Sequence, residues 1–173
     1  MMRITVLLSL SVLILFSACK KTKDTNAEDQ KAGVNSQVIT ELEVSKLKYT
    51  EYALDAKAET IIQDWAEYTQ IAEVIANIKL GDLTFFNDNE KAIEVLLQEL
   101  KQNIPASIES PSIMARIQVL ETKILKLESL THLSTTSKEE LLLTIKEFFV
   151  SFSTLSYQIN KKVEFDNRSI EKP

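Results

Sequence analysis

The chain of 173 residues has few of the residue types that build turns, disulfides and metal sites. It contains two glycines, three prolines, one cysteine and one histidine. One protomer therefore cannot form an internal disulfide, and it cannot assemble a zinc site or a Cys–His nucleophile pair. No glycine-rich loop is present to hold a phosphate group. We predict no cofactor, no bound metal and no catalytic residues.

The ionisable residues that are present are mostly acidic and carry no recognisable site. The formal net charge is −5, and an acidic chain without a basic patch argues against a nucleic-acid partner. We interpret the carboxylates between residues 55 and 73 as the solvated face of a helix, with a divalent-cation site as the weaker alternative. These carboxylates are Asp55, Glu59, Asp64, Glu67 and Glu73. His132 is predicted to lie at the end of a helix, where it interacts with the helix dipole.

The first eighteen residues have the pattern of a secretory signal peptide. Arg3 precedes an apolar run from Ile4 to Phe16, and the small residues Ser17 and Ala18 follow it. As a helix this run spans about 20 Å, which is shorter than the ~30 Å hydrocarbon core of a membrane. A permanent transmembrane helix is therefore the weaker interpretation.

The motif Phe16-Ser17-Ala18-Cys19 resembles the lipobox of bacterial lipoproteins, although Phe16 stands where leucine is more common. The resemblance implies cleavage before Cys19, a diacylglycerol on its sulfur and a third acyl chain on its amino group. Membrane lipid is then a partner through acylated Cys19, because two or three chains make a durable anchor. The expected location is the cell envelope, on the outer membrane facing the periplasm. An ordinary signal peptide followed by a free thiol is the alternative.

The remaining chain divides into a tether, a folded domain and a tail. Residues 19–36 are polar, lack any apolar stripe and are predicted to form a lipid-anchored flexible tether. Residues 37–165 carry regular apolar spacing and are predicted to form the folded domain. Residues 166–173 are predicted to form a frayed tail.

Apolar residues at alternating intervals of three and four predict four helices in the folded domain. The first is long, spans about residues 38–80 and ends at Gly81. A break near Tyr49 and Thr50 is the alternative to one continuous helix, because the apolar spacing lapses at Glu51. A capping box formed by Asn87 and Glu90 predicts the second helix at about residues 88–103. The third is predicted to begin after Ser110, with Pro111 in its first turn, and the fourth after Ser137.

These helices predict an all-α fold, because no alternating pattern or hairpin turn indicates strands. Short connections favour an antiparallel up-down bundle of four helices with a long first helix. In such a bundle the loops at residues 81–87 and 132–136 share one end. The alternative is a three-helix packing, in which the second and third helices stack end to end along the long first one. Residues 115–121 are similar to segments of uncharacterised helical lipoproteins, a resemblance that implies no activity.

Two groups of residues are candidate sites. The first is a ligand pocket between helices, and core packing is its alternative; it comprises Trp65, Tyr68, Phe148 and Phe152. The second is the apolar loop that contains Leu83, Phe85 and Phe86, which either plugs one end of the core or contacts a partner.

The hypothesis that fits these patterns best is a non-enzymatic envelope lipoprotein that acts by protein contact, as an accessory or scaffold. Its expected partner is another envelope protein, and homo-oligomerisation is left open. The second hypothesis is a carrier or sensor that binds an apolar small molecule between helices. A hydrolase that uses paired carboxylates is the weakest of the three.

Overall fold

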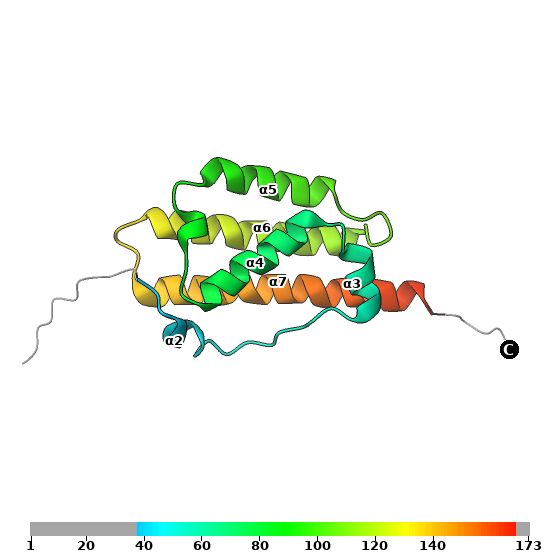
Figure 1. The fold of residues 1–173 in the computed structure, drawn as a ribbon, viewed down its shortest axis with the longest axis horizontal. Coiled ribbons are helices and arrows are strands. Elements are labelled where there is room, and N and C mark those ends of the chain that lie inside the picture. The colour runs from blue at the N-terminus through cyan, green and yellow to red at the C-terminus, as the bar shows by residue number, and fades with distance from the viewer. Residues whose placement is uncertain (1–37, 169–173) are drawn as a thin grey trace, which may run out of the picture. The chain divides into compact units, whose positions relative to one another are not determined.

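The computed structural model describes residues 38–168, and the described chain is helical without any strand. Signal peptide, Cys19, tether and the last five residues lie outside this range. The elements are α2 (Glu41–Val44), α3 (Ala56–Ile62), α4 (Ala66–Lys79), the 3-10 turn η1 (Thr84–Phe86), α5 (Glu90–Gln102), α6 (Pro111–His132) and α7 (Lys138–Asp166). The all-α prediction is therefore confirmed for the described residues (Figure 1).

The framework of the domain is the antiparallel pair of α6 and α7, its two longest helices (Figure 1). A short loop at residues 133–137 joins them, so they run back along each other. The stripe that the sequence predicts for α6 is buried against the core, as expected of one apolar helix face. Its members are Ile113, Ile117, Leu120, Ile124 and Leu127.

The caps predicted for these two helices are confirmed. The Ser110 side chain accepts a hydrogen bond from the backbone N–H of Ile113, and Pro111 occupies the first helical position, where no N–H is needed. Ser137 accepts from the N–H of Glu140 at the start of α7. Both contacts satisfy backbone donors that the helix itself leaves unpaired.

The cap predicted for α5 is wrong. The helix begins at Glu90 with Asn89, not Asn87, at the capping position, and no side chain caps it. Instead, the Asn89 side-chain amide donates to the backbone carbonyl of Phe85. This bond ties the start of α5 to the preceding 3-10 turn.

One continuous helix over residues 38–80 is also wrong, because the chain there breaks into three helices. The alternative, a break near Tyr49 and Thr50, is confirmed. α2 has only four residues, and no helix forms between residues 47 and 55. We call residues 47–55 the strap. The helix breaks there because α7 offers the strap backbone other partners. Ser153 and Asn160 bind it through four hydrogen bonds.

The second break falls between α3 and α4, at residues 63–65. Trp65 precedes α4 with φ −90° and ψ 83°, which is not a helical conformation. The turn brings the Trp65 side chain into the core, where only 1% of it is exposed. After the turn, α4 runs obliquely across the α6–α7 pair, while α5 lies along α6 (Figure 1).

Gly81 ends α4, as predicted. Its φ of +86° lies in the left-handed region, which costs a side-chain-bearing residue energy. A Cβ atom at this position would also lie 2.8 Å from the backbone oxygen of Ile39. Gly81 therefore permits both the turn and the close approach of the chain that precedes α2.

Candidate functional site

The four aromatic residues of the predicted ligand pocket are brought near one another but do not line one cavity. Trp65 and Phe148 are buried in the core, with 1% and 0% of their surface exposed. Tyr68 links the group, with ring centroids 5.6 Å from Trp65 and 4.7 Å from Phe152. Of the four, Tyr68 and Phe152 border a hollow. Trp65 and Phe148 do not border it and pack in the core, which was the alternative to the ligand pocket.

The hollow beside Tyr68 lies between α4, α7 and the strap, and we call it the aromatic pocket. Its volume is about 310 Å³, at the lower end of the range typical of small-molecule sites. Its lining contains five aromatic residues, two carboxylates and two serines. The lining residues are Tyr49, Glu51, Tyr52, Ala53, Leu54, Glu59, Tyr68, Ile75, Phe149, Phe152, Ser153 and Ser156.

The strap forms one wall of the aromatic pocket, and α7 holds it in place. Ser153 accepts from the N–H of Tyr52 at 2.8 Å and donates to the carbonyl of Thr50 at 2.9 Å. Asn160 makes the same pair of contacts further along, with Ala53 and Asp55. The sequence analysis missed this wall because it treated residues 47–55 as helix. Ser153 and Asn160, polar residues within the apolar pattern of α7, were the signal in the sequence that could have indicated it.

Hydrogen bonds and burial set the charge state of the pocket walls. The Tyr68 hydroxyl lies 2.7 Å from Ser156 Oγ, and burial raises the pKa of Tyr68. Burial also raises the pKa of Tyr49. Lys79 Nζ lies 2.7 Å from Glu51 Oε1 and lowers the pKa of that carboxyl. Neutral phenols and a charged Glu51 therefore line the pocket at neutral pH.

The apolar loop predicted as a docking group does not project from the domain. Phe86 is completely buried, and its ring meets that of Phe85 edge-on at 5.2 Å. Leu83 and Phe85 are half-buried and pack against the core. The burial of Phe86 contradicts its proposed partner contact and favours the core plug. Residues 81–84 share a hollow with Thr131 near the end of α6 and Leu141 in the first turn of α7.

A second concave surface, which the sequence analysis did not identify, runs between α6 and α7. We call it the α6–α7 groove; its volume is about 330 Å³, and only these two helices line it. Val119, Leu143 and Val150 are its large apolar residues, with 44%, 55% and 40% of their surface exposed. These residues do not belong to the buried apolar faces of α6 and α7. Apolar residues outside the core-facing positions were the signal in the sequence that could have indicated the groove. The complete lining is Arg116, Val119, Lys123, Leu143, Lys146, Glu147, Val150, Ser151 and Thr154.

The groove lining carries more positive than negative side chains, with Arg116, Lys123 and Lys146 against Glu147. Glu147 accepts from Lys123 and Lys126, each at 3.1 Å, and these two cations lower its pKa. Arg116 and Lys146 form no ion pair with any residue that the structure describes. Two cations without an ion-pair partner among the described residues therefore line the apolar groove.

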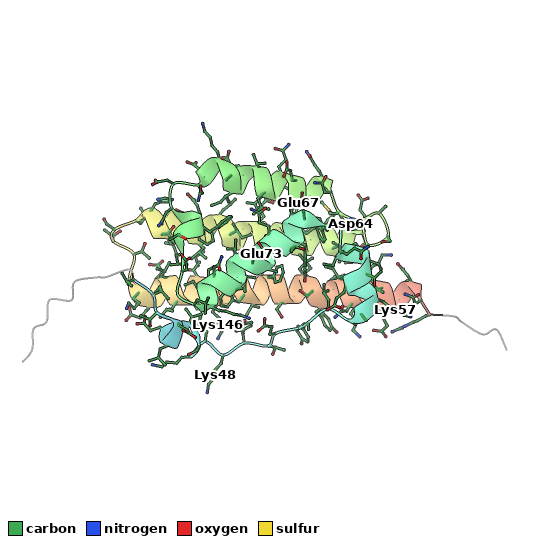
Figure 2. All side chains as sticks on the ribbon, viewed as in Figure 1. Lys48, Lys57, Asp64, Glu67, Glu73 and Lys146 are labelled. Atoms are coloured by element: carbon green, nitrogen blue, oxygen red, sulfur yellow. The ribbon has the colours of Figure 1, made fainter. Side chains whose placement is uncertain are left out.

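One member of the predicted solvated acidic face is instead buried. Glu67 is 7% exposed, accepts from the Asn103 side-chain amide at 2.7 Å and leaves its second carboxylate oxygen unpaired. The reason is the break before α4, which rotates Glu67 towards α5. Figure 2 labels Asp64 in the turn before α4, and Glu67 and Glu73 on α4. Within residues 38–168 no three potential metal ligands gather.

His132 is the last residue of α6, as predicted. Its Nε2 lies 3.2 Å from Glu128 Oε1, one helical turn earlier. His132 and Glu128 border a polar hollow of about 600 Å³ with the first turn of α5. An imidazole beside one carboxylate forms no recognisable catalytic set on its own.

Comparisons with known proteins add no relative. No family model, no curated protein and no solved structure matches this chain. Among the described helices, none combines the length and apolar character needed to cross a bilayer.

Proposed function

We propose that the protein is a lipid-anchored, non-enzymatic component of a bacterial cell envelope that acts by contact with another envelope protein. Acylated Cys19 anchors it to the outer membrane on the periplasmic side, and residues 19–36 tether the domain. In this proposal α4 to α7 form an irregular four-helix bundle. The α6–α7 groove carries the proposal, because it is an exposed apolar surface on the most regular part of the fold.

The proposed occupant of the groove is an amphipathic helix with acidic residues beside its apolar face. Two antiparallel helices leave a straight furrow between them, and an apolar helix face fits such a furrow. Arg116 and Lys146 stand beside Val119, Leu143 and Val150 without internal ion pairs. Acidic side chains on the incoming helix would pair with them, since complementary charge orients and selects a partner.

Photo-crosslinking in intact envelopes tests this proposal. A benzoylphenylalanine replaces Leu143 in the groove, and a matched control replaces Val95, which is 51% exposed on α5. We expect a discrete adduct from position 143, absent from position 95, on an acidic amphipathic helix of another envelope protein. Adducts to a second copy of this chain, to lipid, or to a segment without acidic residues would contradict the proposal.

Charge reversal then tests the pairing. Arg116→Glu with Lys146→Glu should reduce the adduct at least tenfold, since like charges would face each other across the groove. Lys57→Glu on α3 is the control; Figure 2 labels Lys57 and Lys146 on their separate helices. Equal loss from the control variant would show a general charge effect and contradict the proposed pairing.

A second candidate function is a carrier or sensor that binds a small apolar molecule between helices. The aromatic pocket favours it, because Tyr68 and Phe152 border a hollow of about 310 Å³. An increase in melting temperature with a neutral apolar probe, lost in Phe152→Ala, would support this function. A melting temperature unchanged by saturating probe would contradict it.

A further inference from the structure

We propose that the aromatic pocket binds a small organic cation, with a quaternary ammonium group as the chemical class. This inference rests on the second candidate function, whose ligand it changes from apolar to cationic, and it is independent of the α6–α7 groove. The pocket combines aromatic walls, an anionic rim and hydrogen-bond donors that are largely committed within the protein.

The walls supply the first part of the argument. Five aromatic residues line the pocket, and two pairs of them hold their rings close. The ring centroids of Tyr68 and Phe152 lie 4.7 Å apart, and those of Tyr49 and Phe149 lie 5.5 Å apart. Phe149 and Tyr68 are buried, whereas Tyr52 on the strap is 44% exposed, which gives the pocket an aromatic floor and an aromatic rim. Ring π systems attract cations, and cages of such rings recognise quaternary ammonium groups.

The rim supplies the charge. Glu51 and Glu59 line the pocket, and its lining contains no Lys, Arg or His. Lys79 neutralises Glu51 at 2.7 Å, but Glu59 forms no ion pair with any described residue. A bound cation would provide Glu59 with a counter-charge at the pocket mouth. An anion would meet repulsion from this carboxylate and from the aromatic π systems.

The hydrogen-bond donors of the lining are largely committed within the protein. Ser153 donates to Thr50, and Ser156 donates to the carbonyl of Phe152. The Tyr68 hydroxyl and Ser156 Oγ also share a hydrogen bond of 2.7 Å, so both hydroxyls are engaged within the protein. Tyr49 donates to Glu51. A quaternary ammonium group has no N–H and needs neither donors nor acceptors, so it suits these walls better than a carboxylate or a sugar.

Choline and its neutral isostere 3,3-dimethyl-1-butanol separate charge recognition from apolar binding. Each is titrated into the purified full-length chain and followed by calorimetry and by fluorescence. Trp65 is the only tryptophan, and it stacks on the pocket residue Tyr68, so its emission reports on the pocket. We expect choline to bind at least tenfold more tightly than the alcohol.

Paired variants place the binding in the aromatic pocket. Glu59→Gln and Tyr52→Leu should each weaken choline binding at least threefold. Glu94→Gln on α5 and Phe165→Leu near the end of α7 are matched controls outside the lining and should bind choline as the unaltered chain does. Equal losses in variants and controls would overturn the proposed location.

The remaining outcomes separate the two proposals. Equal binding of choline and the alcohol would overturn the cation inference and leave the apolar carrier standing. Failure of both ligands to bind would overturn the inference together with the carrier function. Neither result bears on the α6–α7 groove, which is tested by cross-linking.

Discussion

At the scale of single residues, Trp65 shows how position changes the role of a side chain. It lies in the turn before α4, and the core encloses it completely, yet its Nε1 donor has no partner among the described residues. A buried donor without an acceptor costs free energy. Burial of the apolar ring and its stacking on Tyr68, with ring centroids 5.6 Å apart, offset that cost.

Trp65→Ala should therefore lower the free energy of unfolding by about 3–5 kcal/mol, because the surrounding side chains cannot fill the cavity. Trp65→Phe should cost much less, since it keeps most of the ring and removes the unpaired donor. Urea denaturation of both variants measures the difference. A loss below ~1 kcal/mol for Trp65→Ala would contradict its place in the core.

At the scale of secondary-structure elements, the N-terminal segments are held by polar contacts with α7. The strap uses Ser153 and Asn160, and α2 uses an ion pair at the start of α7. Lys138 Nζ lies 2.9 Å from Glu43 Oε1. Glu43 also completes a capping box with Thr40. Short segments that cannot bury much apolar surface depend on such contacts for their position.

The contact between Glu43 and Lys138 predicts a pH dependence of stability. Hydrogen bonds from Lys138 and Thr40 lower the pKa of Glu43 from 4.5 to about 2. A lowered carboxyl pKa stabilises the folded state above the unfolded pKa, and this stabilisation is lost as the pH falls from about 4.5 towards 2.

Thermal unfolding between pH 7 and pH 2 checks this prediction. Glu43→Gln should melt below the unaltered chain at pH 7, and the two curves should converge by about pH 2. Glu41→Gln, in the same first turn of α2, is the matched control. A gap that stays constant across this pH range would show that charge on Glu43 is not its source.

At the scale of the whole molecule, the two concave surfaces for which we propose ligands have different linings. The α6–α7 groove is open, apolar and flanked by cations, whereas the aromatic pocket lies under the strap beside carboxylates. Opposite local charge suits them to different partners. A protein fixed to a membrane by lipid meets its partners at high local concentration, so that modest affinities at either surface are sufficient.

The anchor itself is tested by Cys19→Ser. We expect a precursor that the lipoprotein peptidase leaves uncleaved and that gains no acyl chains, because in the lipobox interpretation the sulfur accepts the diacylglycerol. Intact mass and membrane fractionation measure both effects. Two results together would contradict the lipobox interpretation. The variant would stay at the membrane, and its mass would differ from that of its precursor by the same amount as in the unaltered protein.

Local patterns in the sequence were enough to predict the all-α class and the helices α5, α6 and α7. Ser110 with Pro111 marks the start of α6, and Ser137 marks the start of α7, because a cap and the turn it satisfies lie within four residues. The stripe through Ile117 and Leu120 likewise depends on local spacing alone.

Only the tertiary structure decided the region from residue 38 to residue 80. Its apolar spacing is compatible with one long helix, but Ser153 and Asn160 bind the backbone of residues 50–55 from more than a hundred residues away. Those bonds replace helical ones and hold the strap as one wall of the aromatic pocket. The separate turn before α4 buries Trp65 and Glu67. The lapse of the apolar spacing at Glu51 indicates where a break can fall. A pattern confined to neighbouring residues cannot anticipate the competitor for the backbone that the fold brings from so far along the chain.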